Sequence, residues 1–183
     1  MKLAAIDIGS NAARLLISEV IDQPGSSKPL FNKLSLVRVP LRLGFDVFEK
    51  GEISKPRLGM IIQTMKAYGH LMNVYGVKHL KACATSAMRD ARNSADVIRK
   101  VKLETGIGIS IITGDDEASY IYDNHIAENL DKDHSYLYID VGGGSTELTY
   151  FADGKLRYKE SFNIGTIRLM KNMVTETHWD ELR

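Results

Sequence analysis

The chain has 183 residues, of which 44% are hydrophobic and 26% are charged, and its formal net charge is +1. This balance is ordinary for a globular domain and gives no sign of a nucleic-acid-binding protein. The single cysteine, Cys83, excludes an internal disulfide and a multi-cysteine metal site. No stretch approaches the ~18 apolar residues of a membrane span, and the N-terminus lacks a signal peptide's features. We therefore expect a cytoplasmic protein that contacts neither nucleic acid nor membrane.

Apolar periodicity and turn signals divide the first two thirds of the chain into elements in the order βββαβαβα. The clearest element is a long helix, because Ser54 suits an N-cap and Pro56 follows just inside it. The predicted elements are strands 2–8, 14–20 and 30–39, a helix from Ser54 to about Tyr75, a strand at 79–84, a small-residue loop at 84–89, a helix from Asn93 or Ser94 to Gly106, a strand at 109–112, and a helix that Asp115 caps and that runs to about Asn129.

The pattern then restarts. Strands are predicted at 135–141, 146–151 and 156–162, and a helix begins at Thr166. The turn Asp153-Gly154 is a strong hairpin signal between the last two of these strands. An internal echo links the two units, because each has an apolar strand, an aspartate at the strand's end and a small-residue turn: Ile6-Asp7-Ile8-Gly9-Ser10-Asn11 and Ile139-Asp140-Val141-Gly142-Gly143-Gly144-Ser145.

These observations predict an α/β protein of two related lobes, 1–128 and 129–183, that share a cleft. Backbone N–H groups of glycine-containing turns converge on anions, and phosphate is a common one. Hydroxyl and amide side chains in the same turns add donors, and arginine binds phosphate oxygens with two parallel hydrogen bonds. The phosphate-binding candidates are Gly9, Ser10, Asn11, Arg14, Arg89, Gly142, Gly143, Gly144, Ser145 and Thr146.

Carboxylates near these turns repel a bare phosphate. Asp7 and Asp140 make sense if Mg²⁺ or its water shell lies between them and the phosphate, because Mg²⁺ uses one or two carboxylates and phosphate oxygens. Glu147, seven residues after Asp140 and across the turn, can bring another carboxylate to the same end of the cleft; the alternative is a strand glutamate that is only solvated. Glu117 follows a strand end and a glycine, where it can act as general base on a water. The alternative is that the acidic residues at 115–117 only complement a helix dipole.

The ordered set of motifs resembles the exopolyphosphatase and guanosine pentaphosphate phosphatase family, which belongs to the actin-like (ribonuclease H-like) ATPase superfamily. The resemblance covers nearly the whole chain. It is carried by Asp7-Ile8-Gly9-Ser10-Asn11 with Arg14, Leu41-Arg42-Leu43-Gly44, Ala84-Thr85-Ser86-Ala87 with Arg89 and Asn93, Gly114 with Glu117-Ala118, Asp140 to Glu147, and Gly165 with Arg168-Leu169.

The resemblance implies hydrolysis of a terminal phosphoanhydride of inorganic polyphosphate or guanosine pentaphosphate, with Mg²⁺ in the cleft between two lobes. It implies that Glu117 is the catalytic base, that Asp7 and Asp140 hold phosphate and metal with help from Glu147, and that Arg89 binds the phosphate chain. It also implies homodimers. The choice between the two substrates stays open, and the actin-like fold is likewise an implication of the resemblance.

Three departures from the family pattern stand out. Asp116 replaces the first of two glutamates, and Ala12 and Ala13 replace a serine and a bulkier apolar residue. The chain also stops at Arg183, inside the first helix of the second lobe, so we expect a truncated chain with exposed sheet edges.

Two other functions remain open. A polyphosphate- or nucleotide-binding sensor without catalysis has no need of a base at Glu117. A kinase of the same fold needs an acceptor pocket and an adenosine-binding segment that the 183 residues lack.

Overall fold

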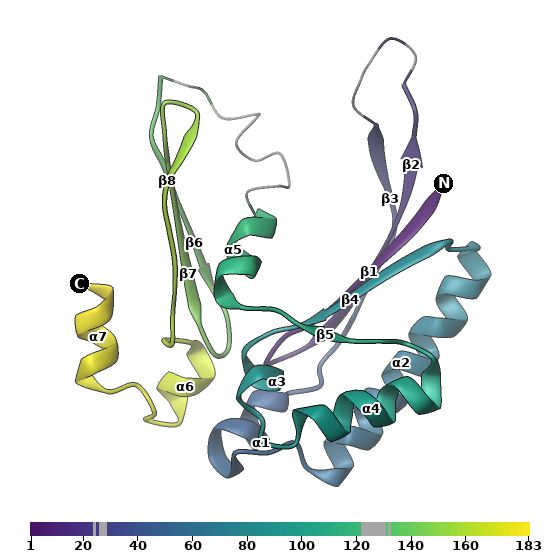
Figure 1. Ribbon diagram of the computed structural model, residues 1–183, viewed down its shortest axis with the longest axis horizontal. Helices are drawn as coiled ribbons and strands as arrows, with labels where there is room; N and C mark the ends of the chain where they lie inside the picture. The colour runs from purple at the N-terminus through teal and green to yellow at the C-terminus, as the bar shows by residue number, and fades with distance from the viewer. Residues whose placement is uncertain (24, 26–28, 122–130, 132) are drawn as a thin grey trace.

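The computed structural model describes residues 1–23, 25, 29–121, 131 and 133–183, which form two lobes, each built on its own sheet (Figure 1). The first sheet has five strands and the second has three. The elements are β1 (Lys2–Ile8), β2 (Ala13–Ile21), β3 (Leu30–Val39), α1 (Leu43–Lys50), α2 (Lys55–Tyr75), β4 (His79–Ala84), α3 (Ser86–Asp90), α4 (Ser94–Thr105), β5 (Ser110–Ile111), α5 (Gly114–Ile121), β6 (Tyr136–Val141), β7 (Thr146–Ala152), β8 (Lys155–Phe162), α6 (Thr166–Met170) and α7 (Glu176–Leu182).

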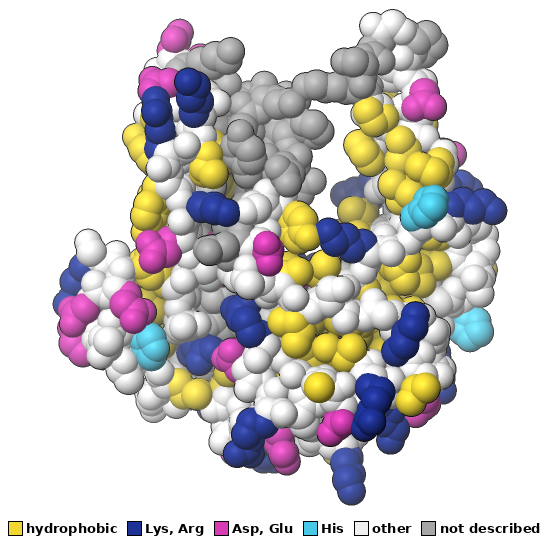
Figure 2. Space-filling model, viewed as in Figure 1, with side chains coloured by type: hydrophobic (Ala, Val, Ile, Leu, Met, Phe, Trp, Pro, Cys, Tyr) yellow, Lys and Arg dark blue, Asp and Glu magenta, His cyan; other side chains and the backbone are white. Residues whose placement is uncertain are grey.

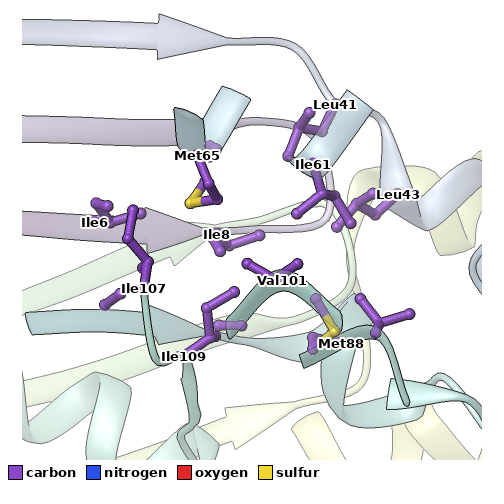
Figure 3. Close-up of a cluster of buried hydrophobic side chains, with 14 of the residues drawn as sticks. Ile6, Ile8, Leu41, Leu43, Ile61, Met65, Met88, Val101, Ile107 and Ile109 are labelled. Carbon is purple, nitrogen blue, oxygen red and sulfur yellow. The ribbon is translucent and has the colours of Figure 1, made fainter. Parts of the chain in front are cut away.

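The first sheet has the order β3-β2-β1-β4-β5, in which β1 pairs antiparallel with β2 and parallel with β4. Helices α2 and α4 pack together under one face of it (Figure 1). Side chains from both layers fill the space between them, and burying this apolar surface is the main stabilising contribution to the lobe (Figure 3). The largest fully buried side chains of this core include Ile6, Ile8, Leu15, Ile17, Ile61 and Met65.

The opposite face of the first sheet carries charged side chains beside apolar ones. Because side chains alternate along a strand, the buried Ala13 and Leu15 of β2 place Arg14 on the other face. The register aligns Asp7 of β1 with Arg14 and with Cys83 of β4, so these residues form one row across the sheet. This row lies at the carboxyl end of β1, where the turns of both lobes meet.

The long helix is confirmed at both ends. The Ser54 hydroxyl accepts a hydrogen bond from the N–H of Arg57, and Gly76 ends the helix with a φ of 68°, in the left-handed region that favours glycine. The helix has 21 residues. Neither this helix nor any other in the described ranges is long and apolar enough to cross a bilayer.

Several local predictions were wrong. The stretch predicted as a loop after β4 contains the short helix α3, and the strand predicted at 109–112 is only Ser110–Ile111. Helix α5 begins at Gly114, and the hydroxyl of Thr113 accepts from the N–H of Asp116, so Thr113 rather than Asp115 lies at its cap position. Helix α1 was not predicted. The single helix expected from Thr166 to Arg183 is instead two helices, α6 and α7.

The second lobe has the predicted βββα order, and its last hairpin turns at Asp153-Gly154, both with positive φ. Helix α5 packs against β7 and β8, so this helix belongs structurally with the second sheet (Figure 1). The predicted boundary between residues 128 and 129 lies outside the described residues. Apolar side chains on one face of β6 are exposed: Leu137, Ile139 and Val141.

Candidate functional site

Two hairpin turns with the same backbone geometry face each other from the two lobes. In the first, the N–H of Gly9 donates to the carbonyl of Ala12 at 3.0 Å. In the second, the N–H of Gly142 donates to the carbonyl of Ser145 at 2.9 Å. The internal echo seen in the sequence is therefore a repeat of structure as well.

The first turn is held in place by the segment that starts α1. The N–H groups of Arg42 and Gly44 donate to the carbonyls of Asn11 and Ser10 at 2.7 and 2.8 Å. The Ser10 hydroxyl is buried and shares a 2.7 Å hydrogen bond with the hydroxyl of Ser86, the first residue of α3. Because the carbonyls of Ser10 and Asn11 accept these hydrogen bonds, the backbone of both turn residues is fixed.

The second turn is held by the start of α6. Three donors bind its carbonyls: the N–H of Thr166 to Gly142, the N–H of Ile167 to Gly143, and Nε of Arg168 to Gly144, at 3.0, 2.9 and 2.7 Å. The same Arg168 side chain pairs with Asp90 of α3 and lies over the ring of Phe48 in α1. Arg168 thus fastens the second turn to the first lobe.

These contacts bring the turns together around a cavity of about 200 Å³. It lies between the lobes, because residues of both line it. Figure 2 shows Lys, Arg, Asp and Glu side chains on the surfaces of both lobes. Both turns, both strand-end aspartates and the start of α5 contribute to its wall. The lining residues are Asp7, Gly9, Ser10, Asn11, Ala12, Arg14, Arg38, Thr85, Ser86, Glu117, Asp140, Val141, Gly142, Gly143, Ser145, Glu147 and Thr166.

The turns leave backbone donors free to face this cavity. Among the described residues, the N–H groups of Ser10, Asn11, Gly143 and Gly144 donate to no carbonyl or side chain. Three of these four residues line the cavity directly. Convergent N–H groups without an internal acceptor form an anion-binding nest.

Glu117 is the most perturbed acid of the site. Its Oε2 is buried and has no hydrogen-bond partner among the described residues. The pKa of Glu117 is raised to about 7, first by burial and then by the nearby carboxylates of Glu147, Asp7 and Asp140, against a lowering effect of Arg89. A carboxyl with a pKa close to neutral is suited to taking a proton at the pH of a cell.

Glu147 is the most deeply buried carboxylate, with 3% of its surface exposed. It accepts a 2.8 Å hydrogen bond from the hydroxyl of Ser161 on β8. Ser161 also touches the start of α5, because a Cβ on Gly114 would stand 2.4 Å from the Cβ of Ser161. Ser161 therefore connects the carboxylate of Glu147 to the helix that carries Glu117.

Asp7 has charged neighbours of both signs in the cavity. Burial raises the pKa of Asp7, Arg14 lowers it, and Asp140 of the other lobe raises it. The Arg14 guanidinium reaches Asp7 only at 3.5 Å, with both side chains about half exposed. Such an exposed pair contributes little to stability.

The donor set fits a magnesium ion held together with a phosphate. Within the described ranges, no group of three or more His, Cys, Asp and Glu residues is placed to hold a metal by itself. Mg²⁺ does not need one, because it binds through one or two carboxylates, substrate phosphates and water. Asp7 and Asp140, which line the same cavity and repel each other, are residues of that kind.

Eleven of the fourteen predicted site residues line the cavity, and three do not. Arg89 donates from its guanidinium to the carbonyl of Ile112 at 2.9 Å. Thr146 is buried and donates to the carbonyl of Ile164. Gly144 faces the first lobe instead, since a Cβ there would stand 2.4 Å from the Ser86 hydroxyl.

Several polar residues of the lining were not predicted from the sequence. Thr85 and Ser86 belong to a motif from which only Arg89 was predicted as a site residue, although hydroxyl groups at the end of a strand were a usable signal. Thr166 was identified only as the start of a helix. Arg38 lies opposite Arg14 on the next strand, and aligning the predicted strands would have found it.

A second, more apolar cavity of about 590 Å³ adjoins the first. The two share Asp7, Arg14, Thr85 and Glu117. The remaining lining is mostly apolar and lies between the open face of the first sheet and α5: Ala5, Ile6, Leu16, Leu36, Lys81, Cys83, Ile112 and Tyr120.

Two lobes with repeated strand–turn–strand units that meet around a polar cavity define a protein of the actin-like ATPase fold. The match to the model of the Ppx/GppA phosphatase family spans residues 20–182. The chain belongs to this family, which confirms the resemblance found in the sequence.

Curated relatives agree with this assignment. The chain is 35% identical over 173 residues to a bifunctional 3-dehydroquinate synthase/phosphatase of Fusobacterium nucleatum, a match that covers 91% of this chain and 25% of that protein. It is 31% identical over 179 residues to exopolyphosphatase 1 of Mycobacterium tuberculosis, covering 96% of this chain and 50% of that protein. The chain thus spans at most half the length of these relatives.

Solved structures agree as well. An exopolyphosphatase from Cytophaga hutchinsonii superposes with a TM-score of 0.82 at 28% identity, covering 94% of this chain and 53% of that one. The Aquifex aeolicus member of the Ppx/GppA family superposes with a TM-score of 0.76 at 31% identity, covering 99% and 58%.

Proposed function

We propose that this chain carries catalytic and phosphate-binding residues of a Mg²⁺-dependent phosphatase. The enzyme removes the terminal phosphate of inorganic polyphosphate or guanosine pentaphosphate. One observation carries the proposal: the buried, unpartnered Oε2 of Glu117 lies in a cavity wall that also holds two anion-binding turns. Family membership and the exopolyphosphatase relatives support the substrate class.

In the proposed reaction the terminal phosphate lies against the free N–H groups of the two turns. Glu117 takes a proton from a water as the water oxygen attacks the terminal phosphorus. The bond from that phosphorus to the bridging oxygen breaks, and the shortened chain leaves with the bridging oxygen. Transition states of phosphoryl transfer need charge neutralisation and a positioned nucleophile more than covalent help, and fixed backbone donors supply part of the former.

Asp7 and Asp140 would hold the magnesium ion, which supplies positive charge next to the phosphate oxygens when bound. Glu147 is buried and bonded to Ser161, so we assign it mainly to raising the pKa of Glu117, which is among the effects that its charge has. Without a magnesium ion the carboxylates of the site outnumber its cations, so a phosphate group would meet net repulsion there.

The apolar cavity beside the site supports the nucleotide as one of the two substrates. A polyphosphate chain gains nothing from a lining of Ala5, Leu16 and Leu36, whereas a nucleobase and ribose have apolar faces to bury there. The glycine turns and Glu117 act on the terminal phosphate, which both substrates have, so they do not distinguish between the two.

Phosphate release from long-chain polyphosphate and from guanosine pentaphosphate tests the proposal, each with Mg²⁺ and with a chelator. We expect release that the chelator abolishes. Binding of both compounds without release would favour the non-catalytic sensor, and the absence of both binding and release would overturn the proposal.

A further inference from the structure

The two arginines that line the phosphate cavity lie directly opposite each other on neighbouring strands. Arg14 of β2 pairs with Arg38 of β3 in the antiparallel register. Both line the cavity, so both lie on the open face of the first sheet. Like charges directly opposite each other in a sheet are destabilising, and a folded protein retains such a pair at some cost to its stability.

The protein compensates only part of this positive charge. Arg14 reaches Asp7 at 3.5 Å. Arg38 is exposed and forms no ion pair with any residue that the structure describes. Asp7, Arg14 and Arg38 therefore form a row of one negative and two positive charges. The row crosses two strand spacings, roughly 10 Å.

The surroundings of this pair restrict what it can bind. The next row of the same two strands pairs Leu16 with Leu36, which offer no hydrogen-bond donor. A charged ligand that leaves the turns is therefore best held along the arginine row. Guanidinium groups bind phosphate oxygens through two parallel hydrogen bonds, so two adjacent arginines suit neighbouring phosphate groups of one chain.

We propose that Arg38, together with Arg14, forms a second phosphate subsite that binds the phosphate groups adjoining the terminal one and directs the substrate toward β3. The inference rests on the proposed function, because it takes the turns as the terminal-phosphate site. It makes Arg38 a residue that selects for chain length, and it gives Arg38 no part in the attack on phosphorus.

Calorimetric titration with two anions that the protein cannot hydrolyse tests the subsite: orthophosphate and methylenediphosphonate, at one fixed Mg²⁺ concentration. Wild type, Arg38→Gln and Lys33→Gln are compared. Lys33 is a matched control, because it lies on the same strand, is exposed and does not line the cavity. We expect Arg38→Gln to weaken the diphosphonate about tenfold or more, to leave orthophosphate nearly unchanged, and Lys33→Gln to change neither.

Three results would overturn the subsite: equal weakening of both anions by Arg38→Gln, no weakening of the diphosphonate, or equal effects of Arg38→Gln and Lys33→Gln. Wild-type protein that binds neither anion would overturn the proposed function as well. Selective diphosphonate binding in a protein that releases no phosphate would contradict hydrolysis and leave the subsite standing.

Thermal unfolding of the ligand-free variants separates binding from folding. Removing Arg38 relieves the repulsion from Arg14, so we expect Arg38→Gln to unfold at the same or a higher temperature than wild type. We also expect the rise in unfolding temperature on adding the diphosphonate to be smaller in this variant. A clear fall in the unfolding temperature without ligand would assign Arg38 a structural role and contradict the proposal.

Discussion

Glu147 lies directly opposite Asp140 on the neighbouring strand of the second sheet. In the first sheet the residue in the same place, opposite Asp7, is Arg14. The two hairpins share the same closing hydrogen bond from glycine, but they differ in charge at this one position.

Because of this difference, the two lobes contribute groups of opposite charge to the site. The second lobe adds a buried carboxylate, which raises the pKa of Glu117. The first lobe adds a guanidinium that faces the cavity beside a second one. The second lobe thus raises the pKa of Glu117, and the first lobe supplies the arginines that face an anion in the cavity.

Replacing Glu117 with glutamine will stabilise the metal-free protein at alkaline pH. The pKa of Glu117 is about 7 in the folded chain against an ordinary value of 4.5. Between these values the unfolded chain releases a proton that the folded chain retains, so stability falls as pH rises through this window. Because Glu117 is only half-buried, we expect Glu117→Gln to gain about 1 kcal/mol at pH 8.

Urea unfolding in the presence of a chelator measures this gain. At pH 4 the carboxyl is mostly protonated in both states, so the variant and wild type should have similar free energies of unfolding. Glu181→Gln, on the exposed side of α7, serves as the control and should have no effect at either pH. A variant that is less stable than wild type at pH 8 would contradict the raised pKa.

Adding a methyl group at Gly165 will displace the second turn. A Cβ there would stand 2.5 Å from backbone atoms of Gly143 and Gly144, and backbone cannot move aside cheaply. We expect Gly165→Ala to destabilise the protein by about 1–3 kcal/mol and to weaken orthophosphate binding. Gly59→Ala in α2 is the matched control: its Cβ meets nothing within 4 Å, and it should stabilise the helix by up to about 1 kcal/mol. Thermal unfolding compares the two variants, and equal effects would refute the clash.

Removing the Ser161 hydroxyl will leave the buried Glu147 carboxylate with one donor fewer. We expect Ser161→Ala to lower the free energy of unfolding by about 1–3 kcal/mol at pH 8. Ser161→Thr keeps the hydroxyl and should retain more of the stability, apart from the strain of its extra methyl against Gly114. Chemical denaturation measures both variants. Wild-type stability in Ser161→Ala would show that the hydrogen bond contributes nothing.

Elements with local signals were predictable from the sequence. The ends of helix α2 were predicted closely because Ser54 and Gly76 mark them by capping chemistry that depends on neighbours in the chain. Helices α1 and α3 were not, because they have only eight and five residues, too few to show an apolar period. Helix α1 also starts after Arg42 in the left-handed conformation, which no residue type there signals.

The site was predictable where it is local and not where it depends on packing between elements. Asp7 and Asp140 could be found because each ends a strand before a small-residue turn. Arg38 enters the site only through the pairing of β3 with β2. Arg89 has the expected residue type, but tertiary packing directs its guanidinium to the carbonyl of Ile112.

The rate of phosphate release as a function of pH, for wild type and Glu117→Gln at saturating Mg²⁺, tests the central claim most directly. If Glu117 is the base, wild-type kcat/KM should rise with pH up to about 7, the pKa of Glu117, and then level off. Glu117→Gln should lower the rate by about 10²–10⁴ and remove the rise. A variant that retains the wild-type rate and the wild-type pH profile would show that Glu117 is not the base.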